Sequence, residues 1–130
     1  MKVTLLGAGA WGTAMASQAA RQLREEDVCL WSRSADQLKA IAQSGENHAY
    51  LPGISLPKNL HLESDFDTAV KRLGVDDLLV IATPMSGLSE TIARVLKIAD
   101  HPLNIVFAHP GNPGSRVNKR RQLLELPLSR

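Results

Sequence analysis

The sequence predicts an α/β fold in which strands alternate with helices. Short apolar runs recur at residues 2–6, 28–31, 78–82 and 104–108. Segments with apolar residues at helical spacing lie between them, and the first run leads straight into a glycine-rich turn. Alternating strands and helices form a parallel sheet with right-handed crossovers. We therefore expect a Rossmann-type doubly wound parallel sheet of about five strands with helices on both faces.

Composition fits one soluble globular domain. The chain has 130 residues, 44% hydrophobic and 22% charged, enough for a single core. The net charge of +2 is too small to indicate a nucleic-acid partner. No apolar run approaches the length of a membrane span, so a membrane partner is not expected either. The single cysteine, Cys29, excludes an internal disulfide, and the N-terminus lacks the apolar core of a signal peptide. A cytoplasmic location is expected.

The turn after the first strand matches a dinucleotide-binding pattern. Residues 7–12 read Gly-Ala-Gly-Ala-Trp-Gly, which is Gly-x-Gly-x-x-Gly. Gly7 allows a tight turn, Gly9 lets a pyrophosphate approach the backbone, and Gly12 lets the next helix pack closely. That helix, at residues 10–23, offers N–H groups and a partial positive charge to phosphates. An ordinary structural turn is the alternative. The predicted cofactor-binding residues of this turn are Gly7, Gly9, Ala10 and Gly12.

Residues 28–45 predict a second strand followed by a second helix. Residues 28–31 are continuously apolar, as expected for a parallel strand covered on both faces. Ser34 and Gln37 have the spacing of a capping box, and the helix that they begin is expected to end at Gly45. Its predicted apolar stripe is Leu38, Ile41 and Ala42.

The remaining elements are marked by caps and apolar stripes. Residues 46–59 lack periodicity and predict a loop, and residues 61–63 predict a short strand. Ser64 is expected to cap a third helix that Gly74 closes. The predicted apolar faces of the last two helices are Phe66, Ala69, Val70 and Leu73, then Leu88, Ile92, Val95 and Leu96.

Ligands of a doubly wound sheet bind at the carboxyl ends of its strands. The segments that follow the strands, residues 7–12, 32–33, 83–84 and 108–109, should therefore meet on one rim. Beyond residue 115 a basic run lacks interleaved aromatic residues and is interpreted as a solvated tail. We expect an NAD(P)-binding domain over residues 1–115 and a basic tail over residues 116–130.

The end of the second strand bears on cofactor choice. A fold that prefers NAD usually has an acidic residue here, but the sequence reads Trp31-Ser32-Arg33-Ser34. Arg33 is predicted to meet a 2′-phosphate, with Ser32 and Ser34 adding hydrogen bonds. A solvated arginine at a strand end is the alternative. NADP or NAD is the expected cofactor, with NADP slightly favoured.

Other reactive side chains form no recognisable centre. The four histidines, His48, His61, His101 and His109, match no zinc spacing, so no metal site is expected. Cys29 lies within a strand and is interpreted as a small buried apolar residue. Asp76 and Asp77 precede a strand and are expected to be solvated.

Three stretches resemble the bacterial NAD(P)-dependent glycerol-3-phosphate dehydrogenases. They are residues 7–14, residues 30–33 and the loop at residues 47–60, where that family has Asn-x-x-Tyr/Phe-Leu-Pro, a second proline and Asn/Thr-Leu. The resemblance covers residues 1–108 well and weakens toward residue 115. It implies a two-domain cytoplasmic enzyme that interconverts dihydroxyacetone phosphate and glycerol 3-phosphate by hydride transfer and feeds phospholipid synthesis.

The resemblance also assigns cofactor contacts by position. It places Trp11 beside the pyrophosphate and Arg33 at the adenosine phosphate end. It places Tyr50 at the flank of the cofactor and Pro84 beside the nicotinamide.

Departures from the family begin after residue 108. The family's Lys-Gly pair is replaced by Pro110-Gly111, and its Glu-Pro-Gly-Thr-Gly by residues 112–116. The helical second domain, which carries the family's catalytic lysine, is not found. We therefore expect a truncated chain, shifted out of register by a frameshift or deletion, with no catalytic residue and no activity alone. The expected partners are a small phosphate substrate and either a homodimer mate or the missing second domain.

Three alternatives stay open at this point. One is a stand-alone NADP-binding module without catalysis, and another is a non-functional fragment. A ketopantoate reductase-like enzyme is the third, but the loop at residues 47–60 argues against it.

Overall fold

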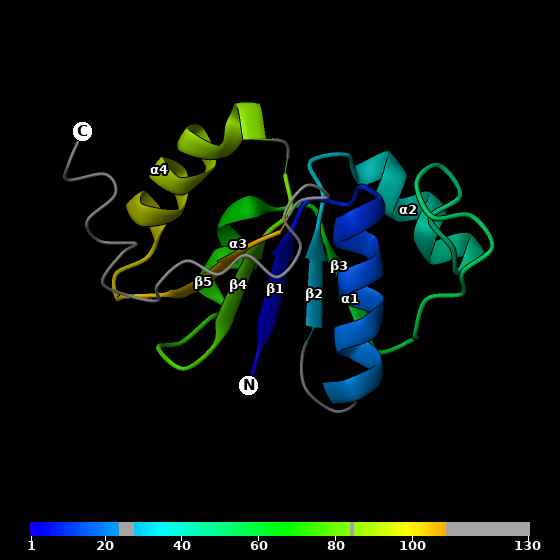
Figure 1. Cartoon of the computed structure of the whole chain (residues 1–130), viewed down its shortest axis with the longest axis horizontal. Coiled ribbons are helices and arrows are strands. Elements are labelled where there is room, and N and C mark those ends of the chain that lie inside the picture. The colour runs from blue at the N-terminus through cyan, green and yellow to red at the C-terminus, as the bar shows by residue number, and fades with distance from the viewer. Residues whose placement is uncertain (24–27, 84, 109–130) are drawn as a thin grey trace.

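A five-stranded parallel sheet forms the centre of the computed structural model, which describes residues 1–23, 28–83 and 85–108. The spatial order is β3-β2-β1-β4-β5 (Figure 1). The strands are β1 (Val3–Leu6), β2 (Val28–Trp31), β3 (Leu60–Glu63), β4 (Leu78–Ile81) and β5 (Asn104–Phe107). The chain moves outward from β1 to β3 and then returns to place β4 beside β1. This confirms the predicted fold class and puts the reversal of strand order between β1 and β4.

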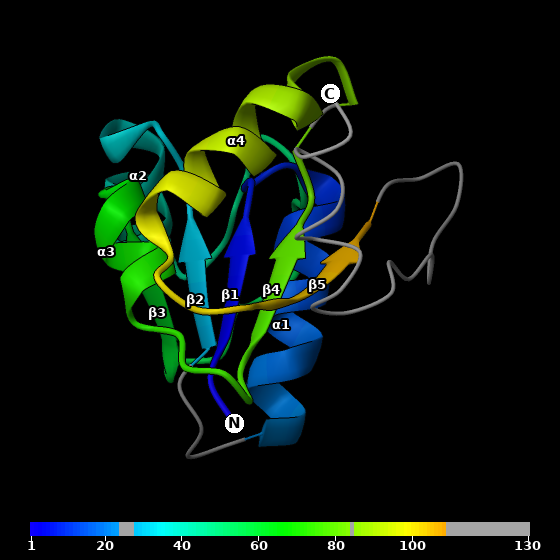
Figure 2. The same cartoon turned by 90° about the vertical axis from the view of Figure 1, so that its left-hand side faces the viewer.

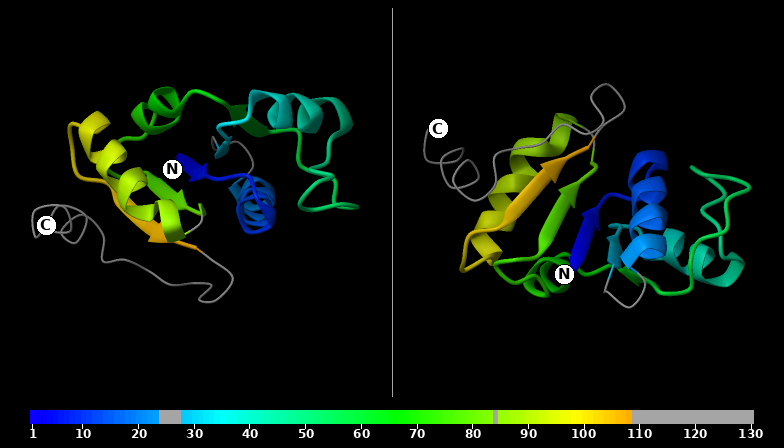
Figure 3. Two further views of the ribbon diagram at one scale, coloured as in Figure 1. Left: turned by 90° about the horizontal axis from the view of Figure 1, so that it is seen from above. Right: turned by 60° about the horizontal axis from the view of Figure 1, so that its bottom comes forward.

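The helices cover both faces of the sheet. They are α1 (Ala10–Leu23), α2 (Ala35–Ser44), α3 (Phe66–Lys71) and α4 (Leu88–Ile98), with a 3₁₀ turn η1 (Met85–Gly87) before α4. Figure 2 shows α3 and α4 on one side of the strands and α1 on the other. In Figure 3, α2 and the loop after it lie beyond the β3 edge of the sheet.

Two hydrophobic cores, one on each face, hold these layers together. The core under α3 and α4 includes Leu6, Phe66 and Ile105, and the core under α1 includes Leu5, Ala16 and Val80. Strand β1 contributes to both because successive side chains point to opposite faces. Its polar member, Thr4, is fully buried, and its hydroxyl donates to the Ala69 carbonyl oxygen at 2.8 Å. That bond ties α3 to the central strand.

Three local expectations are wrong. Asp65, not Ser64, caps α3, and its carboxylate accepts from the Thr68 N–H at 2.9 Å. A carboxylate is at least as good an N-cap acceptor as a hydroxyl, so adjacent candidates compete. Gly74 does not close α3, because the helix ends at Lys71 with a right-handed residue after it. Ala42 is exposed, since α2 packs at the sheet edge and buries only Leu38 and Ile41.

Asp77, which was expected to be solvated, is partly exposed, and its carboxylate also bonds backbone groups. Its carboxylate accepts from the Lys2 N–H at 2.8 Å and from the Gly74 N–H at 2.7 Å. Burial opposes ionisation here, but these two backbone donors hold the pKa of Asp77 below its usual value. The side chain thus joins the turn before β4 to the start of β1.

Cys29 behaves as the sequence predicts. Its side chain is fully buried in the core under α3 and α4, and burial raises the pKa of the thiol to about 11. No helix in the described part of the chain has both the length and the apolar character to cross a membrane.

Replacing Asp77 with Asn should lower the free energy of unfolding by about 1 kcal/mol at pH 7, since an amide retains one acceptor oxygen for the two N–H groups. The pKa of Asp77 is lower in the folded chain than in the unfolded chain. The stabilisation is therefore present above about pH 4 and is lost as the pH falls further. Urea unfolding of both proteins between pH 3 and pH 8 measures this. A difference that does not shrink in acid would contradict the assignment.

Candidate cofactor-binding cleft

A cleft of about 1160 Å³ opens where β1, β2 and β4 end. It gathers most of the predicted rim: the glycine turn, the residues after β2, the residues after β4 and Ala108 after β5. The lining residues are Gly7, Ala8, Gly9, Ala10, Trp11, Ala14, Trp31, Ser32, Arg33, Gln37, Tyr50, Leu51, Phe66, Ala82, Thr83, Ser86, Gly87, Glu90, Thr91, Arg94 and Ala108.

Seven of the nine predicted site residues line this cleft: Gly7, Gly9, Ala10, Trp11, Ser32, Arg33 and Tyr50. Gly12 is buried behind the turn. Pro84 lies outside the described residues, as do His109 and the predicted basic tail.

The glycine turn is tightly constrained on one side and open on the other. Gly7 has φ 115°, which favours glycine, and a Cβ there would lie 2.9 Å from the Ala82 carbonyl oxygen. A Cβ on Gly12 would overlap the Gly7 carbonyl oxygen, so only glycine lets α1 begin this close to β1. A Cβ on Gly9, in contrast, would meet no protein atom within 4 Å. The open space beside the turn is therefore at Gly9, which lines the cleft.

Two amide side chains that sequence analysis did not assign to the site hold this turn. Gln37 Nε2 and Asn47 Nδ2 each donate to the Ala8 carbonyl oxygen at 2.9 Å. The spacing of Ser34 and Gln37 was the available signal, and it was interpreted only as a helix cap.

The predicted capping box is half present. The Ser34 hydroxyl accepts from the Gln37 N–H at 3.1 Å, as expected. The Gln37 side chain does not return to the Ser34 N–H, which donates instead to the Ser32 hydroxyl oxygen at 3.1 Å. That hydroxyl in turn donates to Gln37 Oε1 at 2.7 Å. The hydroxyl proton of Ser32 is thus already used within the protein.

An edge-to-face aromatic pair and an arginine form the wall of the cleft near the end of β2. The Trp31 and Phe66 rings meet edge to face, with centroids 5.1 Å apart, and the Arg94 guanidinium lies 4.2 Å from the Phe66 centroid. Trp31 therefore packs against Phe66 at the start of α3. Arg33 is exposed at the same rim. Both arginines line the cleft, together with one carboxylate, that of Glu90.

Two polar atoms in the cleft wall have no hydrogen-bond partner among the described residues. They are Trp11 Nε1 and Thr83 Oγ1, and both atoms are buried. Buried polar atoms are nearly always bonded in folded proteins, so each is a candidate to bond a ligand. Tyr50, with 55% of its surface exposed, stands on the loop after α2, where the Leu51 N–H donates to the Asn47 carbonyl oxygen at 2.7 Å.

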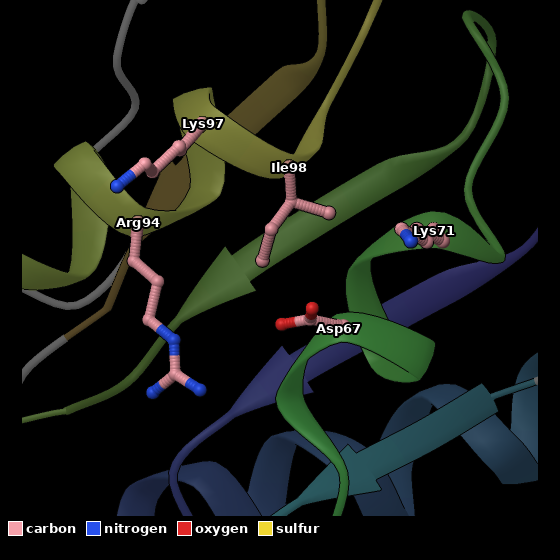
Figure 4. Close-up of a pocket in the computed structure, with 5 residues that line it drawn as sticks. All are labelled: Asp67, Lys71, Arg94, Lys97 and Ile98. Carbon is pink, nitrogen blue, oxygen red and sulfur yellow. The ribbon is translucent and has the colours of Figure 1, made fainter.

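A second hollow, of about 450 Å³, lies between α3 and α4. Its lining residues are Asp67, Lys71, Arg94, Lys97 and Ile98, and Arg94 borders both hollows (Figure 4). It contains no residue of the glycine turn. Over residues 1–23, 28–83 and 85–108, no group of three His, Cys, Asp or Glu side chains is placed to hold a metal ion.

Comparison with known proteins decides the family. A family model described as the N-terminus of NAD-dependent glycerol-3-phosphate dehydrogenase matches residues 2–125. The chain belongs to this family. The resemblance found in the sequence is therefore confirmed, and the match extends past residue 108.

Individual glycerol-3-phosphate dehydrogenases are similar over most of this chain. The enzyme named glycerol-3-phosphate dehydrogenase (NAD(P)+) from Polynucleobacter necessarius subsp. necessarius (strain STIR1) is 71% identical over 111 residues, which are 85% of this chain and 33% of that protein. Its counterpart from Polynucleobacter asymbioticus is 66% identical over the same length. The crystal structure of glycerol-3-phosphate dehydrogenase from Coxiella burnetii superposes with a TM-score of 0.68 at 29% identity, covering 87% of this chain and 33% of that one. The chain thus spans about a third of the length of the curated relatives that it matches.

Alanine substitutions at Gly12 and at Gly9 should affect the stability of the fold to different extents. Gly12→Ala should lower the free energy of unfolding by about 2 kcal/mol or more, because its Cβ meets backbone that cannot move aside. Gly9→Ala should change it by less than about 1 kcal/mol, since its Cβ meets nothing. Chemical unfolding of the two variants measures both free energies of unfolding. Equal losses in the two variants would contradict the described packing of the glycine turn.

Proposed function

We propose that residues 1–115 form the NAD(P)-binding domain of a glycerol-3-phosphate dehydrogenase. The observation that carries the proposal is the cleft at the reversal of strand order, with the open side of the glycine turn in its wall. The reaction of the whole enzyme is hydride transfer between NAD(P)H and dihydroxyacetone phosphate or glycerol 3-phosphate. When bound, the nicotinamide group carries the hydride. This chain's residues bind and orient the dinucleotide.

The pyrophosphate is assigned to the start of α1. The N–H groups of Gly9, Ala10 and Trp11 precede or begin this helix, where backbone donors lack helical partners and the helix dipole favours negative charge. Space at Gly9 admits the phosphates to the backbone. The unbonded indole N–H of Trp11 adds a side-chain donor to this wall.

The adenosine end is assigned to the rim after β2. Arg33 is exposed there and supplies a charge-assisted contact to a 2′-phosphate, which favours NADP slightly. Because Ser32 already donates its proton to Gln37, we propose that it supports the rim and offers the ligand only an acceptor. Tyr50 flanks the cofactor from the loop, and Pro84 borders the nicotinamide.

The described residues that line the cleft include no histidine and no lysine. Their titratable side chains are those of Arg33, Tyr50, Glu90 and Arg94. We assign the proton for the substrate oxygen to the lysine that the family resemblance implies on a second domain. The same lining equally favours the second candidate, an NADP-binding module without catalysis. The physiological setting proposed with the first candidate is cytoplasmic phospholipid synthesis.

Titration with NADPH and NADH tests cofactor binding. Trp11 lines the cleft, so binding of either dinucleotide should change tryptophan fluorescence, and Trp11→Phe should reduce that change. Trp31 supplies the remaining signal in the variant. Unchanged fluorescence and no heat of binding with either cofactor at millimolar concentration would reject the proposed function.

Arg33→Asp tests the assignment of the adenosine end. Loss of one charge-assisted contact should weaken NADPH binding by about 10-fold or more. NADH lacks the 2′-phosphate, so its dissociation constant should change by less than about 3-fold. Calorimetric titration of both cofactors against both proteins measures these dissociation constants. Equal weakening of NADPH and NADH binding would contradict the assignment of Arg33 to the 2′-phosphate.

A further inference from the structure

The carbonyl group of Ala8 is held by two donors from separate elements. Gln37 comes from α2 and Asn47 from the loop after it, and each side-chain N–H lies 2.9 Å from this oxygen. A carbonyl oxygen has two lone pairs, so the two amides occupy its full acceptor capacity. The peptide group between Ala8 and Gly9 is therefore fixed by side chains 29 and 39 residues away in sequence.

Asn47 is built into this position. Only 2% of its surface is exposed, and its second N–H donates to the Thr13 hydroxyl oxygen at 2.8 Å. Thr13 is fully buried in the first turn of α1, and its backbone N–H donates to the Gly9 carbonyl oxygen at 3.0 Å. One side chain thus holds the glycine turn and the first turn of the helix together.

Fixing the Ala8 carbonyl also fixes the direction of the Gly9 N–H. In a planar trans peptide the C=O and N–H bonds point in opposite directions. With the carbonyl directed at Gln37 and Asn47, the Gly9 N–H is directed away from both. No acceptor in the described ranges takes this N–H, and Gly9 lines the cleft with open space at its Cβ position.

We propose that Gln37 and Asn47 are positioning residues for the pyrophosphate of the dinucleotide. They hold the Ala8–Gly9 peptide so that the Gly9 N–H is presented to the cleft before the ligand arrives. The ligand then does not have to reorient the turn, which keeps the cost of binding low. This inference rests on the proposed function, and it gives the amide at position 47 of the loop a task at the binding site.

Gln37 also connects the two ends of the cleft. Its Oε1 accepts from Ser32 after β2, while its Nε2 donates to Ala8 in the glycine turn. Within the part of the chain that the structure describes, Asn47 makes no hydrogen bond to the residues that follow β2. A variant at position 47 therefore tests the pyrophosphate end with little disturbance of the adenosine end.

The test compares ligands with and without a pyrophosphate on the full chain. The variants are Asn47→Leu and Gln37→Met, which keep side-chain size but remove the donors, and the matched control is Gln43→Met on the exposed face of α2. ADP-ribose carries the pyrophosphate, and adenosine 2′-monophosphate does not. Calorimetry gives the affinities, and circular dichroism melting confirms that each variant is folded.

Each variant should bind ADP-ribose about fivefold more weakly, the effect of one neutral hydrogen bond. Adenosine 2′-monophosphate should bind with less than about twofold change to Asn47→Leu, and Gln43→Met should bind both ligands as the original chain does. A purely structural role would weaken both ligands equally. Should Asn47→Leu not fold, Asn47→Ala, which removes the same donors and also leaves the residues after β2 unchanged, decides by the same ratio.

The outcomes separate this inference from the proposed function. If the original chain binds neither ADP-ribose nor a nicotinamide dinucleotide, the proposed function fails. Suppose instead that the original chain binds them. If the folded variants then bind ADP-ribose as tightly as the original chain does, or if the folded variant at position 47 loses both ligands in parallel, the positioning role alone is overturned.

Discussion

The close approach of α1 to β1 is the constraint on which the rest of the structure depends. A side chain at Gly12 would overlap the Gly7 carbonyl oxygen, and one at Gly7 would press on the backbone after β4. Three segments therefore meet at one point. The Gly7 N–H brings in a fourth segment, the end of β2, by donating to the Trp31 carbonyl oxygen at 3.0 Å. This packing sets where α1 begins, and it places the open side of the turn at the reversal of strand order. The cleft is a consequence of that geometry.

Much of the fold follows from the sequence because its signals are local. Four of the five strands lie in short, mainly apolar runs bounded by turn residues, and α1 has the predicted bounds, Ala10–Leu23. The errors arose where neighbouring residues offer similar chemistry. Ser64 and Asp65 are both good caps, and only the tertiary path of the chain selects Asp65. Asp77 reads as a solvated residue because its donors, on Lys2 and Gly74, are brought to it by the fold.

Parts of the candidate site could be predicted where the sequence carries a recognisable binding motif. The glycine pattern and Arg33 fall on the cleft because both follow strands that end on the same rim. The amides that hold Ala8 were not predictable, since Gln37 has the spacing of an ordinary capping box and Asn47 lies in a loop without periodicity. The loop at residues 47–60 identified the family without revealing a physical role. The structure gives one to Asn47, whose buried amide bonds the turn and the helix at once.

The most direct measurement is a ¹⁵N-labelled NMR titration of the full chain with NADPH, following every backbone amide. If the cofactor binds as proposed, the largest shifts fall at Gly9, Ala10 and Trp11, with a second group at Ser32 and Arg33. NADH then reproduces the shifts of the first group more strongly than those of the second. Shifts confined to the hollow between α3 and α4, at Lys71 and Lys97, would contradict the proposed binding, as would a spectrum that NADPH leaves unchanged.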